Sequence, residues 1–204
     1  MKVLLINGSP HPKGCTYTAL AEVEKSLRAA GIETEWAQLG TKPVRGCIAC
    51  GGCRGKGKCV FDDDGCNALA TQIQGADGIV IGSPVYYAGP NGALCALLDR
   101  VFYSSGGRFD GKLGAAVVSC RRGGASAAFD RLNKYFTISN MPVVPSQYWN
   151  SIHGNAPEQA AQDLEGLQIM RTLGSNMAWL LQQRAAGGLP VPEREARATT
   201  SFIR

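Results

Sequence analysis

The chain has 204 residues, enough for one sizeable hydrophobic core, and we expect a single domain over residues 1–204. Its 21 basic and 16 acidic residues give a net charge of +5, and the basic residues are spread along the sequence. No apolar run approaches the roughly 20 residues that a membrane helix needs. A mild, scattered excess of positive charge slightly favours phosphorylated small molecules as ligands and says little about nucleic acid. We expect neither nucleic acid nor a membrane among the partners of this protein.

The eight cysteines bear on the cellular compartment. Lys2 is followed by only four apolar residues before Asn7, which is too short a run for an export signal. In proteins that are not exported, thiols are more often reduced, metal-bound or redox-active than disulfide-bonded. We therefore expect a cytoplasmic protein.

The hydrophobic pattern alternates between short apolar runs and segments of helical period. The apolar runs predict five strands, at residues 1–6, 33–39, 78–82, 113–119 and 141–146. The helical period predicts helices at residues 16–30, 67–74, 91–102, 125–136 and 157–183. Strands that alternate with helices join through right-handed crossovers into a parallel sheet. We therefore expect an α/β fold with a doubly wound, five-stranded parallel sheet and helices on both faces.

Two segments lie outside this alternation. Residues 40–66 form a loop rich in glycine, lysine and cysteine, far longer than a usual connection. Loops of this length in a compact domain are usually functional. Residues 187–204, which include Pro190 and Pro192, are expected to form an extended tail.

Residues 7–18 connect the first predicted strand to the first predicted helix. This stretch matches neither the Gly-x-x-x-x-Gly-Lys of a Walker loop nor the Gly-x-Gly-x-x-Gly of a dinucleotide site. It combines Gly8 and Gly14 with hydroxyl side chains and a helix start, whose free amides and dipole attract an anion. The pattern favours a monophosphate site of the kind found in FMN proteins, and an ordinary capped turn is the alternative.

Two further segments follow predicted strands. Residues 83–89 come after the third strand, and residues 119–124 come after the fourth. Ligands of open parallel sheets bind at the carboxyl ends of the strands, where the strand order reverses. Tyr86 and Tyr87 can stack on a planar ring, and the glycines at 123 and 124 permit a close approach. We therefore expect a phosphate segment, a ring segment and a segment for the polar edge of that ring to meet in one cleft.

Several ordered motifs resemble those of the NADPH-dependent FMN reductase family. They are Asn-Gly-Ser-Pro-x-x-x-Gly-x-Thr from Asn7, Ser-Pro-Val-Tyr-Tyr from Ser83, Leu98-Asp99-Arg100, Tyr148-Trp149-Asn150 with His153-Gly154, and Phe202-Ile203-Arg204. Within the family the chain is most similar to the iron–sulfur flavoproteins. The resemblance implies a flavodoxin-like fold with strand order 2-1-3-4-5 and bound FMN. It also implies NAD(P)H or a ferredoxin-type protein as electron donor, and a homodimer or homotetramer.

Matching these motifs residue by residue assigns the FMN contacts. Phosphate contacts fall on Ser9, Gly14, the backbone of Cys15, Thr16 and Tyr17, and ring contacts on Pro84, Val85, Tyr86, Tyr87, Ser119, Arg121, Gly123 and Gly124. Arg121 would stabilise the anionic reduced flavin, and His153 could donate a proton; a solvated turn and a structural hydrogen bond are the respective alternatives. No other catalytic residue is expected, because the flavin itself carries the hydride and electron transfer. Cys15 and Cys95 depart from the family pattern, in which asparagine and lysine are common.

The long loop offers a second candidate site. Cys47, Cys50 and Cys53 are spaced at three-residue intervals, and Cys59 follows after five further residues. Four thiolates can ligate a 4Fe-4S cluster, and the spacing resembles the compact cysteine motif of iron–sulfur flavoproteins. Free thiols and a zinc site stay open as alternatives.

The resemblance implies an oxidoreductase that passes electrons to a small acceptor such as a quinone or a flavin. With a cluster, the protein would conduct electrons between the flavin and a partner such as ferredoxin. A flavodoxin-type electron carrier or redox sensor without turnover is the alternative function.

Overall fold

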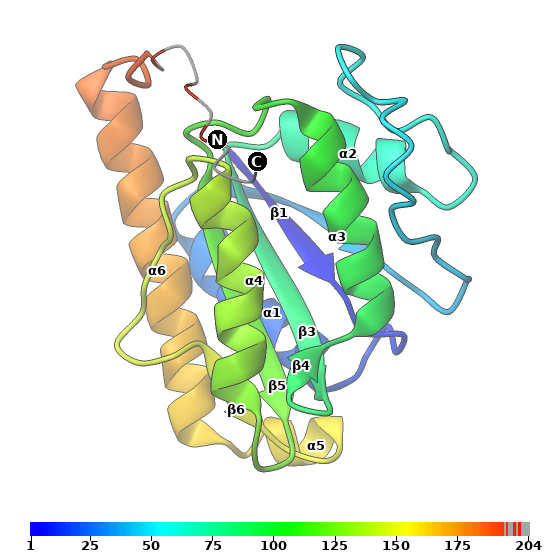
Figure 1. The fold of residues 1–204 in the computed structure, drawn as a ribbon. Coiled ribbons are helices and arrows are strands. Elements are labelled where there is room, and N and C mark those ends of the chain that lie inside the picture. The colour runs from blue at the N-terminus through cyan, green and yellow to red at the C-terminus, as the bar shows by residue number, and fades with distance from the viewer. Residues whose placement is uncertain (194, 196–197, 199, 201–204) are drawn as a thin grey trace.

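A parallel sheet forms the centre of the molecule (Figure 1), in a computed structural model that describes residues 1–193, 195, 198 and 200. Its strands lie in the order β2 (Glu33–Gln38), β1 (Lys2–Asn7), β3 (Gly78–Tyr86), β5 (Leu113–Cys120) and β6 (Ser151–His153). Each is parallel to its neighbour, and the short β4 (Gly89–Pro90) pairs antiparallel with the end of β3. The predicted doubly wound sheet and its order are confirmed, with β4 as an addition.

Helices cover both faces of this sheet. In Figure 1, α3 (Gly92–Ser105) and α4 (Ala125–Ile138) lie in front of the strands and α1 (Cys15–Ala29) lies behind them. The front core also includes α2 (Cys66–Gln74), and the rear core includes α6 (Leu164–Gly187). The one-turn α5 (Pro157–Ala160) follows β6.

The two cores explain why the first strand is a continuous apolar run. Val3 and Leu5 pack with α1 and α6, whereas Leu4 and Ile6 pack with α2, α3 and α4. Successive side chains of a strand point to opposite faces, so a strand covered on both sides needs apolar residues at every position.

Two predicted elements differ from the structure. The strand predicted at residues 141–146 is wrong: Val143 forms an isolated bridge with Gly114, and residues 151–153 take the strand position. Pro142 and Pro145 lack the amide donors that a ladder requires. The helix predicted at residues 157–183 is two helices, because Asp163 caps α6 by accepting a hydrogen bond from Gly166 N at 2.9 Å.

The cysteine-rich segment is a loop, as predicted. Residues 39–65, all of them described, contain no helix or strand, and Figure 1 shows them as a cyan excursion beside α2 and α3. The described part of the predicted tail is likewise free of helix and strand beyond Gly187, while Phe202, Ile203 and Arg204 lie outside the described residues. Within the described residues, no helix has both the length and the apolar character needed to cross a bilayer.

Candidate functional site

A cleft of about 770 Å³ opens at the carboxyl edge of the sheet. The loop after β1, the end of β3 and the end of β5 all contribute to its lining, so the three predicted segments do meet there. Nine predicted FMN contacts line it: Ser9, Gly14, Cys15, Thr16, Pro84, Val85, Tyr86, Ser119 and Arg121. The volume lies within the range of small-molecule sites.

The phosphate segment ends in an open helix start. Gly14 occupies the N-cap position of α1, and no side chain caps the helix. The first-turn amides of α1 are therefore available to an anion in the cleft. The turn before it must approach β3 closely, because Gly8 N donates to Gly82 O at 2.8 Å and a Cβ on Gly8 would lie 2.7 Å from that oxygen.

Two buried hydroxyls fix the phosphate segment, residues 7–18, to the end of β5, which also lines the cleft. Thr16 Oγ1 and Ser119 Oγ lie 2.8 Å apart, and both residues are at most 5% exposed. Since Thr16 is in the first turn of α1 and Ser119 is near the end of β5, the bond sets their mutual position.

Cys15 also lines the cleft at the start of α1. Burial raises the pKa of its thiol, and Sγ donates to Gly154 O at 3.6 Å. A neutral thiol at this position adds no negative charge next to a bound phosphate.

The ring segment forms a small hairpin at the cleft rim. Val85 pairs with Pro90 and Tyr86 with Gly89, and the turn residues Tyr87 and Ala88 have φ of 49° and 60°. The backbone of the β5–α4 loop approaches this turn at Gly124, whose φ is 89° and where a Cβ would lie 2.7 Å from Ala88 Cα. Glycine at 124 thus lets the two rim segments touch.

Five predicted residues do not line the cleft: Tyr17, Tyr87, Gly123, Gly124 and His153. The Tyr17 ring packs on Trp36 with centroids 5.0 Å apart, and Tyr87 is fully exposed. His153 faces Asp163, since its Nδ1 lies 3.4 Å from the carboxylate and its backbone amide donates to the same oxygen at 2.7 Å.

Sequence reasoning missed part of the cleft. Further lining residues are His11, Pro12, Lys13, Cys120, Gly154, Asn155, Ala156 and Pro157. Residues 154–157 follow β6, so the correct strand at 151–153 would have pointed to them. Gly154 N donates to Cys120 O at 3.0 Å, which ties this fourth segment to the end of β5.

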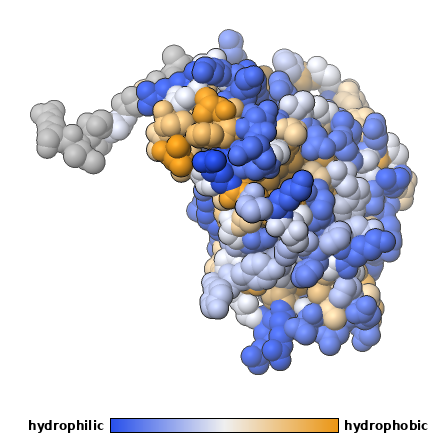
Figure 2. All heavy atoms as spheres, turned by 90° about the vertical axis from the view of Figure 1, so that its right-hand side faces the viewer, coloured by the Kyte–Doolittle hydropathy of each residue, from blue (hydrophilic) through white to orange (hydrophobic). Residues whose placement is uncertain are grey.

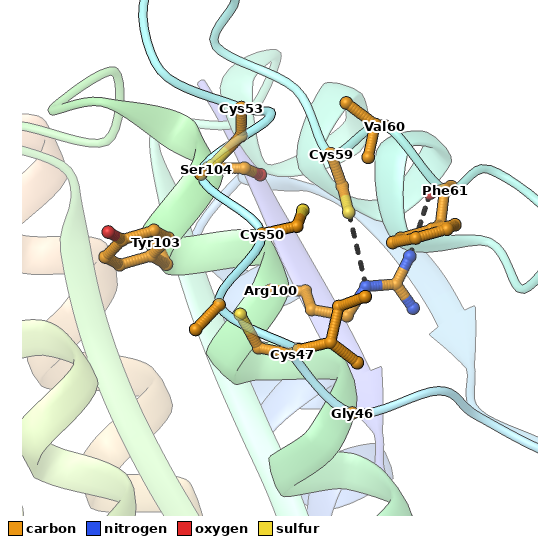
Figure 3. Close-up of a pocket in the computed structure, with 13 residues that line it drawn as sticks. Gly46, Cys47, Cys50, Cys53, Cys59, Val60, Phe61, Arg100, Tyr103 and Ser104 are labelled. Carbon is orange, nitrogen blue, oxygen red and sulfur yellow. Dashed lines mark hydrogen bonds between the residues drawn. The ribbon is translucent and has the colours of Figure 1, made fainter.

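The cysteine loop encloses a second, smaller pocket against α3 (Figure 3). Cys47, Cys50, Cys53 and Cys59 all line it, together with side chains of α3 that include Arg100 and Tyr103. Cys47 and Cys50 are exposed, and the other two are half-buried. Among the described residues, no three His, Cys, Asp or Glu side chains are already gathered closely enough to hold a metal ion.

Two thiols near this pocket have opposite pKa shifts. Burial raises the pKa of Cys59, but hydrogen bonds from the Phe61 backbone and from Arg100 outweigh burial and hold it below the usual thiol value. Cys66 is fully buried at the start of α2, and burial raises its pKa to about 12. Because the thiolate is the form that binds metal, Cys59 is the better ligand of the two.

The NADPH-dependent FMN reductase model matches residues 1–156 of the chain. The chain belongs to this family. It is 35% identical over 186 residues to an iron–sulfur flavoprotein of Methanocaldococcus jannaschii, covering 87% of this chain and 96% of that protein. An iron–sulfur flavoprotein of Methanosarcina thermophila is 30% identical, with 89% and 96% covered. The similarity to the iron–sulfur flavoproteins of the family is thereby confirmed.

Solved structures confirm the flavodoxin-like fold of this family member. The NAD(P)H:quinone oxidoreductase from Methanothermobacter marburgensis superposes with a TM-score of 0.68 at 17% identity, covering 87% of this chain and 98% of that one. An archaeal flavodoxin superposes with a TM-score of 0.61 at 15% identity, covering 89% and 99%. The chain is a flavodoxin-like flavoprotein of an oxidoreductase family.

Both sites contain residues that suit the groups named in the family. The open helix start and hydroxyls of the large cleft suit the FMN phosphate, and Pro84, Val85 and Tyr86 provide an apolar wall. Four cysteines line the small pocket, and four thiolates are the donor set of a 4Fe-4S cluster.

Proposed function

We propose that the protein is an FMN-dependent oxidoreductase that takes electrons from NAD(P)H or a ferredoxin-type protein and delivers them to a small acceptor such as a quinone or flavin. The main support is the meeting of three strand-end segments in one cleft that begins at an uncapped helix start. FMN, when bound, supplies the hydride and electron transfer.

The residues of the cleft would share the work of binding. Ser9 and the first-turn amides of α1 would hold the phosphate, with Thr16 fixed by Ser119. Arg121 lines the cleft, is exposed, and would offset the negative charge of the reduced ring. His153 is not assigned a role here, because its ring faces Asp163.

We also propose that Cys47, Cys50, Cys53 and Cys59 ligate a 4Fe-4S cluster. Their support is their shared pocket, their spacing and the iron–sulfur flavoproteins to which the chain is similar. A cluster would carry single electrons between the flavin and an external protein.

We place the protein in the cytoplasm as a homodimer or homotetramer, without nucleic acid or membrane partners. Exposed aromatic side chains support self-association: Tyr87 at the cleft rim is fully exposed, and Tyr148 and Trp149 are 59% and 57% exposed. Light scattering of the purified protein tests the assembly, and a monomer at micromolar concentration would contradict it.

One anaerobic experiment tests the function. The purified protein is assayed for FMN, iron and sulfide, and its absorption spectrum is recorded before and after NADPH or reduced ferredoxin. We expect a yellow protein that bleaches, with about four irons per chain. A colourless protein that cannot be reconstituted with FMN overturns the proposal. If the protein contains flavin but no iron, the cluster proposal alone is overturned and the four cysteines are free thiols. If it contains zinc in place of iron, the zinc alternative is supported.

Steady-state kinetics separate the enzyme from an electron carrier. We expect continuous oxidation of NAD(P)H, or of reduced ferredoxin, when a soluble quinone is added. Reduction of the flavin without turnover would support the flavodoxin-type carrier or sensor instead.

A further inference from the structure

Arg100 is the largest side chain that the described residues enclose completely. It lies on α3 and is 2% exposed, so its charge has been withdrawn from water. A buried charge is costly unless it is paired and its donors are satisfied. The groups that pair with the Arg100 guanidinium must therefore offset the cost of burying its charge.

All of these partners lie in the cysteine loop or at its end. Nε donates to Cys59 Sγ at 3.4 Å, and the terminal nitrogens donate to Phe61 O at 2.8 Å and Arg45 O at 3.1 Å. The guanidinium also pairs with Asp64, whose carboxylate accepts from Arg45 N at 3.0 Å. One side chain thus joins both ends of a long segment to a rigid helix. Figure 3 shows it between Cys59, Phe61 and the loop that carries Cys47.

The shape of the arginine fits this task. Its planar fork directs five N–H donors along fixed directions, whereas lysine presents a compact ammonium on a flexible stem. A lysine at position 100 would keep the charge next to Asp64. It could not reach the sulfur and the carbonyl oxygens at the same time.

We propose that Arg100 is a positioning residue that fixes the cysteine loop on α3 and, through its N–H···S bond to Cys59, raises the reduction potential of the cluster. The statement about the potential rests on the proposed function, whereas the statement about the loop concerns only this chain. A hydrogen bond to a ligating sulfur stabilises the more negative, reduced cluster, and such bonds are among the factors that set cluster potentials.

Arg100→Lys tests the proposal, and Arg108→Lys is the matched control. Arg108 NH1 donates to Gly57 O at 3.1 Å, so it also contacts the loop but bonds no sulfur. Both variants are reconstituted anaerobically, assayed for iron and titrated with EPR detection. For R100K we expect about a tenfold lower ratio of reduced to oxidised cluster at a fixed ambient potential, equivalent to a midpoint about 59 mV lower.

Comparison with R108K decides whether a change in R100K supports the proposal. Loss of iron in R100K alone also supports the proposal. A full iron content with an unchanged midpoint, or the same change in R108K, overturns the role of the N–H···S bond.

Hydrogen exchange of the cluster-free protein tests the loop separately. The amides of Arg45 and Cys59 donate to Asp64 and Asn67 side chains, so they report on the anchor. In R100K we expect their exchange to be at least tenfold faster, with α4 unchanged and R108K close to wild type. Unchanged exchange overturns the positioning role.

Failure of the cluster proposal and failure of the Arg100 proposal give different experimental results. If the wild-type protein binds no iron, the cluster proposal fails while hydrogen exchange still decides the role of Arg100 in the loop. If R100K does not fold, Asp64→Asn weakens the same anchor but keeps an oxygen acceptor, and the same amides should exchange faster to a smaller extent. Wild-type exchange in D64N would then overturn the proposal.

Discussion

At the scale of single residues, the Thr16–Ser119 hydrogen bond carries a measurable share of stability. Both hydroxyls are buried, so removing one leaves the other without its partner. We expect Thr16→Val and Ser119→Ala each to lower the free energy of unfolding by about 1–3 kcal/mol. The double variant should cost less than the sum, because no hydroxyl is then left unpaired. Urea denaturation of the four proteins in a double-mutant cycle measures this.

Thr71 provides the control for that cycle. Its hydroxyl donates to Asn67 O within α2 and is exposed, so Thr71→Val should change the stability by less than about 0.5 kcal/mol. Strictly additive losses for Thr16 and Ser119 would contradict a direct bond between them.

Tyr17 shows the limit of motif matching at this scale. The motif places Thr16 and Tyr17 side by side, but adjacent residues on a helix point about 100° apart. Thr16 therefore faces β5, and Tyr17 faces Trp36 on β2. A sequence motif shows that a helix start is special, but only the packed helix shows which side chains face the cleft.

At the scale of elements, the contact between α1 and α6 depends on a glycine. A Cβ on Gly174 would lie 2.7 Å from Val23 O and 2.7 Å from Ser26 Cβ, both on α1. We expect Gly174→Ala to destabilise the protein by about 1–3 kcal/mol, because the helices must separate. Gly187 ends the same helix with no atom near its Cβ position. Gly187→Ala should be neutral or stabilising by up to about 1 kcal/mol. Thermal unfolding compares the two, and equal losses would contradict this account.

The same two helices are joined by an ion pair with a predictable pH dependence. Burial raises the pKa of Glu22, but hydrogen bonds from Lys25 and Arg171 outweigh it and hold the pKa below the usual value. A lowered pKa means that the stabilisation is present above about pH 4.5 and is lost as the pH falls through the folded-state pKa. We expect Glu22→Gln to cost about 0.5–1 kcal/mol at pH 7 and less at pH 3, where more of the carboxylate is protonated. Urea midpoints at both pH values test this, and a constant difference would contradict it.

A strand or helix could be predicted from the sequence only where its own residues determine where it begins and ends. Residues 3–7 of the first strand are buried, so the apolar run at residues 3–6 alone identified it. Residues 141–146 are also apolar, yet Pro142 and Pro145 remove two ladder donors, and the chain pairs later through Ile152. The only sequence signal for the break between α5 and α6 was Asp163, a typical N-cap residue, and the helical apolar pattern continues past it. The cleft residues 154–157 were missed because the last strand was predicted at residues 141–146 instead of 151–153.

At the scale of the whole molecule, residues 40–61 of the cysteine loop stand out as a basic stretch. Lys42, Arg45, Arg54, Lys56 and Lys58 lie in the cysteine loop, with no acidic residue between positions 36 and 61. Asp62, Asp63 and Asp64 follow at the end of the loop, so the loop as a whole has a net charge of +2. The face that carries the loop is largely hydrophilic with an apolar patch in its upper part (Figure 2), and Ile48 and Val60 of the loop are exposed.

A basic loop around a candidate cluster should steer an acidic electron donor toward it. Long-range attraction of this kind speeds encounter and is screened within about 8 Å at physiological salt. We therefore expect reduction by an acidic ferredoxin to slow about tenfold or more between 50 and 500 mM salt. Stopped-flow absorbance of the flavin measures the rate, and reduction by excess dithionite serves as a reference for the intrinsic reactivity.

Charge removal in the loop makes the same prediction site-specific. Lys56→Gln with Lys58→Gln should slow reduction by the acidic ferredoxin several-fold at low salt and flatten its salt dependence. Lys25→Gln with Lys134→Gln removes the same charge from exposed positions on α1 and α4, and should leave the rate close to wild type. Equal slowing in both variants would mean that overall charge matters and the loop does not. No effect in either would exclude the loop as the electrostatic entry point for electrons.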